Sequence, residues 1–314
     1  MRTQAIGKSS LISSRLSYGC MRISGAWDPA KVTPEMEKRG VLSVLSAFEA
    51  GYTLFDHADI YCGGLCESIY GRALKEHAEL KRRGLVATKC GIRWQGDGGA
   101  DAPHRYDFSY EHIMGSCEQS LRRLGVECID LYQLHRPDVL ADPAEIARAF
   151  TLLRSQGKVK YFGVSNFSPS QVDAVRSACP MPLVVNQVEI HLARLAPFED
   201  GTLDQCLALG MTPLAFSPLG GGMLGDGGRP WDQDPRRDFW IKTLPVVDAM
   251  AGALGVSRTV LSLAWLLKHP SGIIPIVGSV QPERIKDAAR ADSLDLSRED
   301  WYRLLLAARG KPLP

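Results

Sequence analysis

The sequence predicts an α/β fold in which eight parallel strands close into a (β/α)8 TIM barrel. Eight apolar runs of strand length alternate with helical patterns, which is typical of βαβ units and a parallel sheet. Unusual polar residues follow seven of these runs at their carboxyl ends, and a closed barrel brings such ends to one mouth. The 314 residues show no composition shift and no Pro/Ser-rich linker, so we expect one domain over residues 1–314.

The expected strands are short apolar, β-branched or aromatic runs between turn residues. Before them, residues 1–15 form a polar lead-in, which we interpret as a hairpin that closes one end of the barrel. We place the eight strands at residues 17–22, 52–56, 85–89, 130–135, 161–165, 183–190, 212–217 and 273–278.

The helices between the strands are expected from apolar residues at i, i+3 and i+4 and from capping residues at their ends. Two insertions, 92–108 and 225–239, follow strand carboxyl ends and should form long loops at that face. Helices are expected from Pro34, over 67–77, 110–124, 143–156 and 169–178, and twice more between 284 and 309. The expected N-caps are Ser109, Asp142, Ser168 and Ser257, and the glycines expected to end helices are Gly125 and Gly157.

Charge and composition exclude several classes of partner. The 37 basic and 35 acidic residues give a formal net charge of +2, so the chain offers no basic field for nucleic acid or an anionic membrane. No apolar run reaches the ~18 residues of a membrane span, and residues 1–10 are polar, so we expect a cytoplasmic protein. The 8 cysteines are scattered, which indicates reduced thiols, and Cys62 and Cys66 lack a second pair that would complete a zinc site.

Four polar residues near strand ends form a set that can transfer a proton. Asp56, Lys89 and His135 each end a predicted strand, while Tyr61 follows on a loop that can return over the end of its strand. A phenol has an unperturbed pKa of about 10, and a neighbouring ammonium group lowers it. We therefore expect Lys89, held charged by Asp56, to lower the pKa of Tyr61 and make it a general acid. His135 would then polarise a substrate carbonyl oxygen.

A metal-dependent hydrolase is a rival interpretation of the same strand ends. His57, Asp59, His135 and His191 all lie near them, and such side chains bind metal ions. His57 directly follows Asp56, however, so the two side chains point to opposite faces of the strand and only one can face the mouth. We therefore predict no metal site.

Seven short motifs occur in order along the chain, and together they resemble one known family. They are Phe55-Asp56-x-Ala58-x-x-Tyr61, Lys89 at a strand end, Leu134-His135-Arg136-Pro137-Asp138, Gly163-Val164-Ser165-Asn166-Phe167, Asn186-Gln187, Phe216-Ser217-Pro218-Leu219-Gly220 and Pro275-Ile276-Val277-Gly278-Ser279. The chain resembles the aldo-keto reductase superfamily over about residues 15–308. It is most similar to the bacterial YdhF-like branch at residues 56–61 and in the glycines after Leu219.

This resemblance implies a catalytic tetrad and an oxidoreductase. By position the tetrad is Asp56, Tyr61, Lys89 and His135, with Tyr61 as the general acid. The implied reaction is reduction of an aldehyde or ketone to an alcohol by hydride transfer from NADPH, which returns NADP+. The alternative is a redox-sensing subunit of the same fold that binds the cofactor with little turnover, although an intact tetrad argues against it.

The resemblance also implies where NADPH binds, at the C-terminal mouth of the barrel and without a Rossmann domain. The implied cofactor residues, in order from the carboxamide to the adenosine, are Ser165, Asn166 and Gln187 at the carboxamide, Phe216 under the nicotinamide ring, Ser217, Leu219 and Gly220 at the pyrophosphate, and Ser279 and Arg284 at the 2′-phosphate. Gly278 stands where many members carry a lysine, so the preference for NADPH over NADH depends mainly on Arg284. Near the adenine, Asp287 keeps an acid while Ala288 replaces an amide.

The substrate is expected to be a small carbonyl compound, and the protein a monomer. Five aromatic residues in the loops of the mouth have two open interpretations: they line an apolar pocket for the substrate, or they pack the loops. They are Trp27, Trp94, Tyr106, Phe108 and Trp231.

Overall fold

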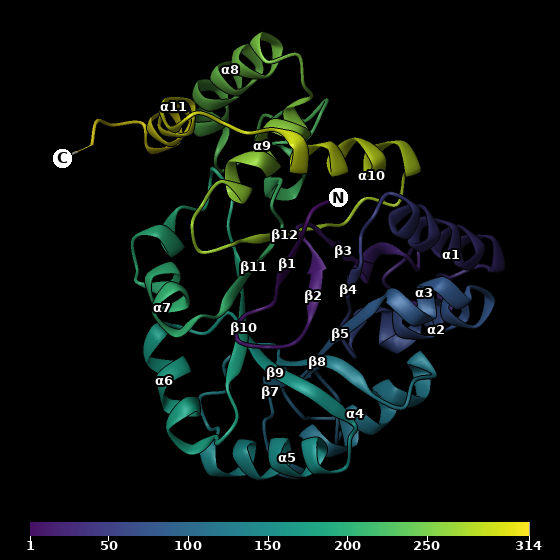
Figure 1. The fold of residues 1–314 in the computed structure, drawn as a ribbon. Helices are drawn as coiled ribbons and strands as arrows, with labels where there is room; N and C mark the ends of the chain where they lie inside the picture. The colour runs from purple at the N-terminus through teal and green to yellow at the C-terminus, as the bar shows by residue number, and fades with distance from the viewer. Residues whose placement is uncertain (314) are drawn as a thin grey trace.

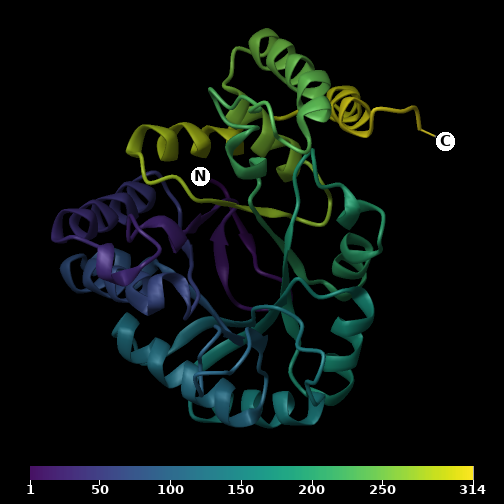
Figure 2. The same cartoon turned by 180° about the vertical axis from the view of Figure 1, so that it is seen from behind.

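Eight parallel strands close into a barrel, which confirms the predicted fold class. The computed structural model describes residues 1–313, and its barrel strands pair in the order β10-β11-β12-β3-β4-β5-β8-β9, with β9 returning to β10. At the seam between the last and first barrel strands, Ile276 pairs with Ser17 and Val277 with Tyr18. Figures 1 and 2 show the helices arranged around these strands from the front and from behind.

The barrel strands lie close to the predicted ranges. The largest difference is in the first, because the chain leaves the sheet after Gly19 and turns through the 3-10 helix η1 (Cys20–Arg22), where the backbone N–H of Ile23 donates to the carbonyl of Cys20. The eight strands are β3 (Ser17–Gly19), β4 (Leu54–Asp56), β5 (Leu85–Cys90), β8 (Ile129–Leu134), β9 (Val159–Ser165), β10 (Leu183–Glu189), β11 (Thr212–Phe216) and β12 (Ile274–Val277).

The predicted caps begin and end the helices. Ser109, Asp142, Ser168 and Ser257 each accept a hydrogen bond from a backbone N–H of the first turn, and Gly125 ends its helix in the left-handed conformation. The helices are α1 (Pro34–Glu49), α2 (Leu65–Glu76), α3 (Ala78–Arg83), α4 (Tyr110–Leu124), α5 (Pro143–Ser155), α6 (Pro169–Ala178), α7 (Thr202–Leu209), α8 (Arg237–Ala253), α9 (Arg258–Leu267), α10 (Pro282–Ala289) and α11 (Arg298–Arg309).

A hairpin closes the amino-terminal end of the barrel, as predicted. Strands β1 (Thr3–Ala5) and β2 (Ile12–Ser14) pair antiparallel and lie across the barrel in Figure 1. Ile6 and Leu11, at the turn of this hairpin, are buried against apolar side chains inside the barrel such as Leu54. This end is therefore sealed by apolar packing.

The insertions shape the opposite end. Residues 92–108 contain a short antiparallel hairpin of β6 (Ile92–Arg93) and β7 (Arg105–Tyr106), and residues 225–239 run into α8. Helices α10 and α11 follow β12, as expected for the tail.

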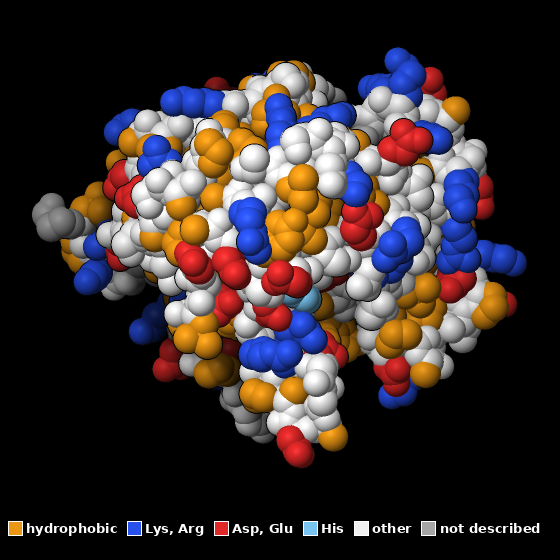
Figure 3. All heavy atoms as spheres, turned by 90° about the horizontal axis from the view of Figure 1, so that it is seen from below, with side chains coloured by type: hydrophobic (Ala, Val, Ile, Leu, Met, Phe, Trp, Pro, Cys, Tyr) orange, Lys and Arg blue, Asp and Glu red, His pale blue; other side chains and the backbone are white. Residues whose placement is uncertain are grey.

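The helices and the surface charges can be compared with the expectations for a membrane span and a basic field. Within residues 1–313, no single helix is long and apolar enough to cross a bilayer, and α8 with α9 reaches that length only as a pair bent by 94°. On the face shown in Figure 3, Lys and Arg side chains are interspersed with Asp and Glu, and no area of one sign dominates.

Candidate active site

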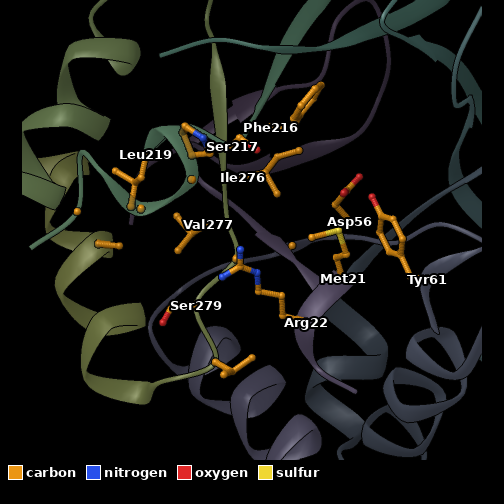
Figure 4. A pocket seen from close by; sticks show the side chains of 18 of the residues that line it. Met21, Arg22, Asp56, Tyr61, Phe216, Ser217, Leu219, Ile276, Val277 and Ser279 are labelled. Atoms are coloured by element: carbon orange, nitrogen blue, oxygen red, sulfur yellow. The ribbon is translucent and has the colours of Figure 1, made fainter. Parts of the chain in front are cut away.

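The strand carboxyl ends surround a pocket of about 840 Å³, which we call the mouth pocket. A pocket of this size is within the ordinary range for ligand sites. It runs from Asp56 and Tyr61, past Phe216, to Leu219 and Ser279, and Figure 4 shows these side chains around one cavity. Residues distant in the sequence thus meet here because all barrel strands point the same way.

Lys89 holds the centre of the catalytic end. Its ammonium nitrogen lies 2.8 and 2.9 Å from the two carboxylate oxygens of Asp56, donates to the backbone carbonyl of His57 at 2.5 Å, and lies 3.4 Å from the Tyr61 hydroxyl oxygen. These partners use all three donors of an ammonium group. Lys89 and Asp56 are 1% and 3% exposed, so the ion pair is buried and fixed in place.

A tight left-handed turn places Tyr61 over the strand end. Tyr61 opens the 3-10 helix η3 (Tyr61–Gly64), and the backbone of Cys62, Gly63 and Gly64 has positive φ angles of 49°, 59° and 89°. A side chain at Gly64 would also collide with Arg123, since a Cβ there would lie 2.6 Å from its Cδ. The two glycines therefore allow the chain to reverse between β4 and α2 with the phenol facing Lys89.

The prediction for the pKa of Tyr61 is wrong in its net direction. The Lys89 ammonium does lower this pKa, but burial raises it more, so the pKa of Tyr61 is above its ordinary value. The burial of Tyr61 depends on the loops that assemble around the mouth, and it cannot be predicted from the residues next to Tyr61 in the sequence. The consequence is a phenol that carries its proton at neutral pH, as a proton donor must.

His135 is neutral in this environment. Burial, and then the positive charges of Lys89 and Arg136, hold the pKa of His135 well below its ordinary value. Its backbone N–H donates to the carbonyl of Cys90 at 2.9 Å, which fixes the residue at the end of β8, and its ring meets the Tyr61 ring edge-on at 5.9 Å. A neutral imidazole beside the phenol can donate an N–H to a substrate oxygen without competing for the proton.

The three residues predicted to bind the carboxamide lie together: Ser165 ends β9, Asn166 follows it, and Gln187 is on β10. The Ser165 hydroxyl donates to the backbone carbonyl of Gln187 at 2.8 Å, and the Asn166 side-chain amide donates to the Ser165 hydroxyl at 2.8 Å. The Gln187 side-chain amide donates to Asp56 at 3.3 Å, while its carbonyl oxygen Oε1 is buried without a partner. An unpartnered buried acceptor suits a ligand that brings an N–H, such as a carboxamide.

The loop after β11 supplies the next part of the wall. Phe216, Ser217 and Leu219 line the mouth pocket as predicted, but Gly220 does not, because it is buried against Trp240 and His191. Its neighbours Gly221 and Gly222 line the pocket instead, and neither has an atom within 4 Å of the place where a Cβ would stand. The loop thus presents bare backbone to the pocket.

The residues predicted for the adenosine lie at the far end. Gly278, Ser279, Arg284 and Asp287 all line the mouth pocket, from the end of β12 to the first turns of α10. Arg284 is exposed, whereas Asp287 is half-buried and forms an ion pair with Arg290 at 2.9 Å. Arg284 therefore offers a positive charge to a phosphate at this end, and the exposed Arg22 also lines the pocket.

The histidines of the rival metal site are separated. His57 is buried outside the barrel wall with its ring 4.6 Å from the Tyr70 ring, and burial lowers its pKa to about 3. His191 bonds instead to Glu189, 3.1 Å away. Among residues 1–313, no three His, Cys, Asp or Glu side chains are grouped as metal ligands.

Three of the five loop aromatics fit one of the two interpretations. Trp27 and Trp94 line the mouth pocket, 6.3 Å apart and edge-to-face, and Trp27 lies 6.4 Å from the Tyr61 ring. Phe108 is buried in the loop packing, and Tyr106 and Trp231 are exposed outside the pocket wall. Two tryptophans therefore border the space next to the proton donor.

Four charged wall residues were not among the predicted site residues. Arg22 in η1, Arg136 directly after His135, Asp226 after the glycine loop and Glu283 in the first turn of α10 all line the pocket. Arg136 places its guanidinium 5.8 Å from the centre of the Phe216 ring. Arg136 falls inside a motif and could have been found there, but no pattern marks Arg22 or Asp226.

The comparisons with known proteins agree with this geometry. The model of the Aldo/keto reductase family matches residues 15–305. The chain belongs to the aldo/keto reductase family. It is 39% identical over 315 residues to the 6-dehydroglucose reductase of Novosphingobium aromaticivorans, covering 98% of this chain and 96% of that protein. It is also 39% identical to the oxidoreductase YdhF of Escherichia coli, over 89% of this chain and 91% of that one.

Solved structures of aldo/keto reductases have the same fold. The glycerol dehydrogenase of Gluconobacter oxydans superposes with a TM-score of 0.84 at 27% identity, covering 99% of this chain and 97% of that chain. Membership of the aldo/keto reductase family implies an oxidoreductase with a nicotinamide cofactor. The mouth pocket fits such a cofactor, because its wall contains three suitable features. They are an unpartnered amide acceptor at Gln187, bare backbone at Gly221 and Gly222, and an exposed guanidinium at Arg284.

Proposed function

We propose that the protein is an NADPH-dependent reductase of aldehydes or ketones in which Tyr61 is the general acid. One observation carries the proposal: Lys89, buried and paired with Asp56, lies 3.4 Å from the Tyr61 hydroxyl oxygen. The phenol retains its proton because its pKa is raised, and the ammonium can stabilise the phenolate left after transfer.

The roles of the side chains follow from their places in the pocket. A nicotinamide cofactor, when bound, would supply the hydride that the carbonyl carbon needs. Ser165, Asn166 and Gln187 would hold its carboxamide. Tyr61 gives its hydroxyl proton to the carbonyl oxygen, and His135 donates an N–H to the same oxygen. Hydride and proton together convert the carbonyl to an alcohol.

NADPH is proposed over NADH because of Arg284. Its guanidinium is exposed at the adenosine end of the pocket, and a guanidinium suits a phosphate better than a ribose hydroxyl. Gly278 contributes no charge beside it. The preference is therefore expected to rest mainly on Arg284 and to be modest.

For the substrate, we propose polyhydroxylated aldehydes as the first class to test. Two relatives, 39% and 36% identical, are named 6-dehydroglucose reductases. Here the exposed rings of Trp27 and Trp94 offer flat apolar surfaces near Tyr61, and Arg136 adds hydrogen-bond donors beside His135. Such a combination suits a sugar-like molecule with one apolar face and many hydroxyl groups.

Oxidation of NADPH by a panel of carbonyl compounds tests the function. We expect reduced-nicotinamide absorbance to fall with sugar dialdehydes, simple aldehydes or ketones, and NADPH to be used in preference to NADH. Binding of NADPH with no turnover on any member of a broad panel would contradict a reductase and support the redox-sensing alternative. Failure to bind either dinucleotide would contradict both.

We further propose that the protein acts in the cytoplasm as a monomer. The monomer is supported by the completeness of the site, since one chain supplies the tetrad and every proposed cofactor residue. Light scattering coupled to size exclusion, with activity measured across dilution, tests this. Activity lost on dilution would contradict it.

A further inference from the structure

Asp138 joins the loop of the catalytic histidine to the insertion that borders the substrate space. It lies three residues after His135, and its carboxylate oxygen Oδ2 accepts a hydrogen bond from the backbone N–H of Phe108 at 3.0 Å. The other oxygen, Oδ1, accepts from the backbone N–H of Leu140 at 2.9 Å. The bond from Phe108 ties the end of the β6–β7 insertion to the loop that follows β8, and the bond from Leu140 fixes Asp138 within that loop.

The insertion is fixed at the Phe108 end and carries Trp94 near the other. Phe108 is 1% exposed and packs on Gly91, where a Cβ would lie 2.1 Å from its ring, so the pair interlock. From this base, Arg93 pairs with Asp107 at 3.1 Å and brings the strand before Trp94 against the strand before Phe108. These contacts connect Phe108 to the strand that leads to Trp94 across the hairpin.

The Trp94 side chain meets other aromatic rings at the mouth, while its backbone N–H donates to Asp97 of the same insertion at 2.9 Å. It is 42% exposed, its ring stacks on His104 at 5.3 Å and meets Trp27 edge-on at 6.3 Å, and Trp27 in turn lies beside Tyr61. Its place in the pocket wall thus depends on where the hairpin stands. Within residues 1–313, the hydrogen bond from the Phe108 N–H to Asp138 is the one that links this hairpin to the loop bearing His135.

We propose that Asp138 is a positioning residue for the substrate: it sets the distance between the Trp94 side of the pocket and His135, and so selects for carbonyl substrates large enough to contact Trp94. It touches no reacting atom. Small aldehydes that occupy only the space between Tyr61 and His135 should be indifferent to it. This inference rests on the proposed function for its substrate, but the tie itself is a property of the fold.

The first test is the replacement Asp138→Ala, with Asp138→Asn as the conservative variant. In Asp138→Ala, the KM for an aromatic aldehyde should rise roughly tenfold or more, since a charge-assisted hydrogen bond is lost, while that for propanal stays unchanged. The kcat for propanal and the dissociation constant of NADPH should not change. Asp138→Asn keeps one acceptor, so its KM for the aromatic aldehyde should rise less.

Asp142→Ala is the matched control. Asp142 lies four residues further along, at the exposed N-cap of α5, and its replacement should leave both KM values unchanged.

Two further readouts separate positioning from general destabilisation. Trp94→Ala should also raise the KM for the aromatic aldehyde. In the double variant with Asp138→Ala, this KM should be no higher than in the more affected single variant, because both replacements disturb the Trp94 side of the pocket. Amide hydrogen exchange over residues 92–108 should quicken in Asp138→Ala, whether or not the enzyme turns over. Unchanged exchange, equal rises in KM for both aldehydes, or additive effects of the two replacements would each overturn the proposal. Faster exchange in a protein without reductase activity would instead refute the proposed function alone.

Discussion

The two ends of the barrel are built from the same strands and are buried to a similar degree, yet their chemistry differs. At the amino-terminal end, Ile6 and Leu11 fill the barrel with apolar contacts. At the carboxyl-terminal end, Lys89 and Asp56 form a buried ion pair, and Oε1 of Gln187 is left without a partner. Buried charges and unpartnered polar atoms cost stability, so their concentration at one end marks the end that meets a ligand. Changes at the mouth should alter turnover, and changes at the hairpin should alter stability only.

The largest effect is expected from Lys89→Met. It removes the ammonium group that stabilises the Tyr61 phenolate, so turnover should fall by roughly 10²- to 10⁴-fold. It also leaves the Asp56 carboxylate buried without its partner, which should lower the free energy of unfolding by about 3–5 kcal/mol. Steady-state kinetics and urea denaturation measure the two effects.

A double variant separates these two consequences. Asp56→Asn combined with Lys89→Met removes both charges, so it should recover much of the stability but none of the turnover. Recovery of turnover in the double variant would show that the Lys89 ammonium has no part in proton transfer.

Ile6→Ala probes the opposite end. Ile6 is fully buried inside the barrel, so truncation should lower the free energy of unfolding by about 2–5 kcal/mol through lost contacts and a cavity. The kcat and KM of the folded enzyme should be unchanged, because the hairpin lies across the barrel from the mouth. A changed kcat in the fully folded variant would contradict the separation of stability and turnover between the two ends.

A smaller effect is expected from Arg284→Gln. The dissociation constant of NADPH should rise about tenfold, since a charged contact to the 2′-phosphate is lost, while that of NADH should change little. Exposure of Arg284 makes misfolding an improbable cause of any change, and quenching of tryptophan fluorescence measures both constants. Equal weakening of both cofactors would place Arg284 away from the 2′-phosphate.

The smallest effect is expected from pH, because the rate of reduction should stay constant around neutral and mildly alkaline pH. Because burial raises the pKa of Tyr61 above its ordinary value, the donor stays protonated and reduction should not vary from about pH 7 to about pH 9. His135 should add no slope there, since its lowered pKa keeps it neutral. Alcohol oxidation needs the phenolate and should accelerate as pH rises. A loss of reduction rate within that interval would mean that Lys89 outweighs burial.

Much of this arrangement could be predicted from the sequence, because parallel strands place their last residues at one mouth. Asp56, Lys89 and His135 were found in that way, and Tyr61 from its return over β4. Strand and helix ends also followed from short-range signals, as Ser168 shows with its reciprocal cap to Gln171.

What could not be predicted depends on the assembled fold. The sequence predicts that Lys89 lies close to Tyr61, but only the closed mouth shows that burial raises the pKa of Tyr61 more than the ammonium lowers it. Likewise, which glycine of the loop faces the pocket depends on Trp240, which buries Gly220 and leaves Gly221 at the wall. Arg22 reaches the pocket because the first strand ends early, at Gly19, and the chain turns through η1.

The rate of a single turnover tests the central claim most directly, with NADPH bound first and a reactive aldehyde added. In Tyr61→Phe the rate should fall by roughly 10²- to 10⁴-fold while the dissociation constant of NADPH stays unchanged. Tyr106→Phe, which removes an exposed hydroxyl outside the pocket wall, should match the unmodified protein. A near-normal rate in Tyr61→Phe would contradict the account, because the proton would then come from another group.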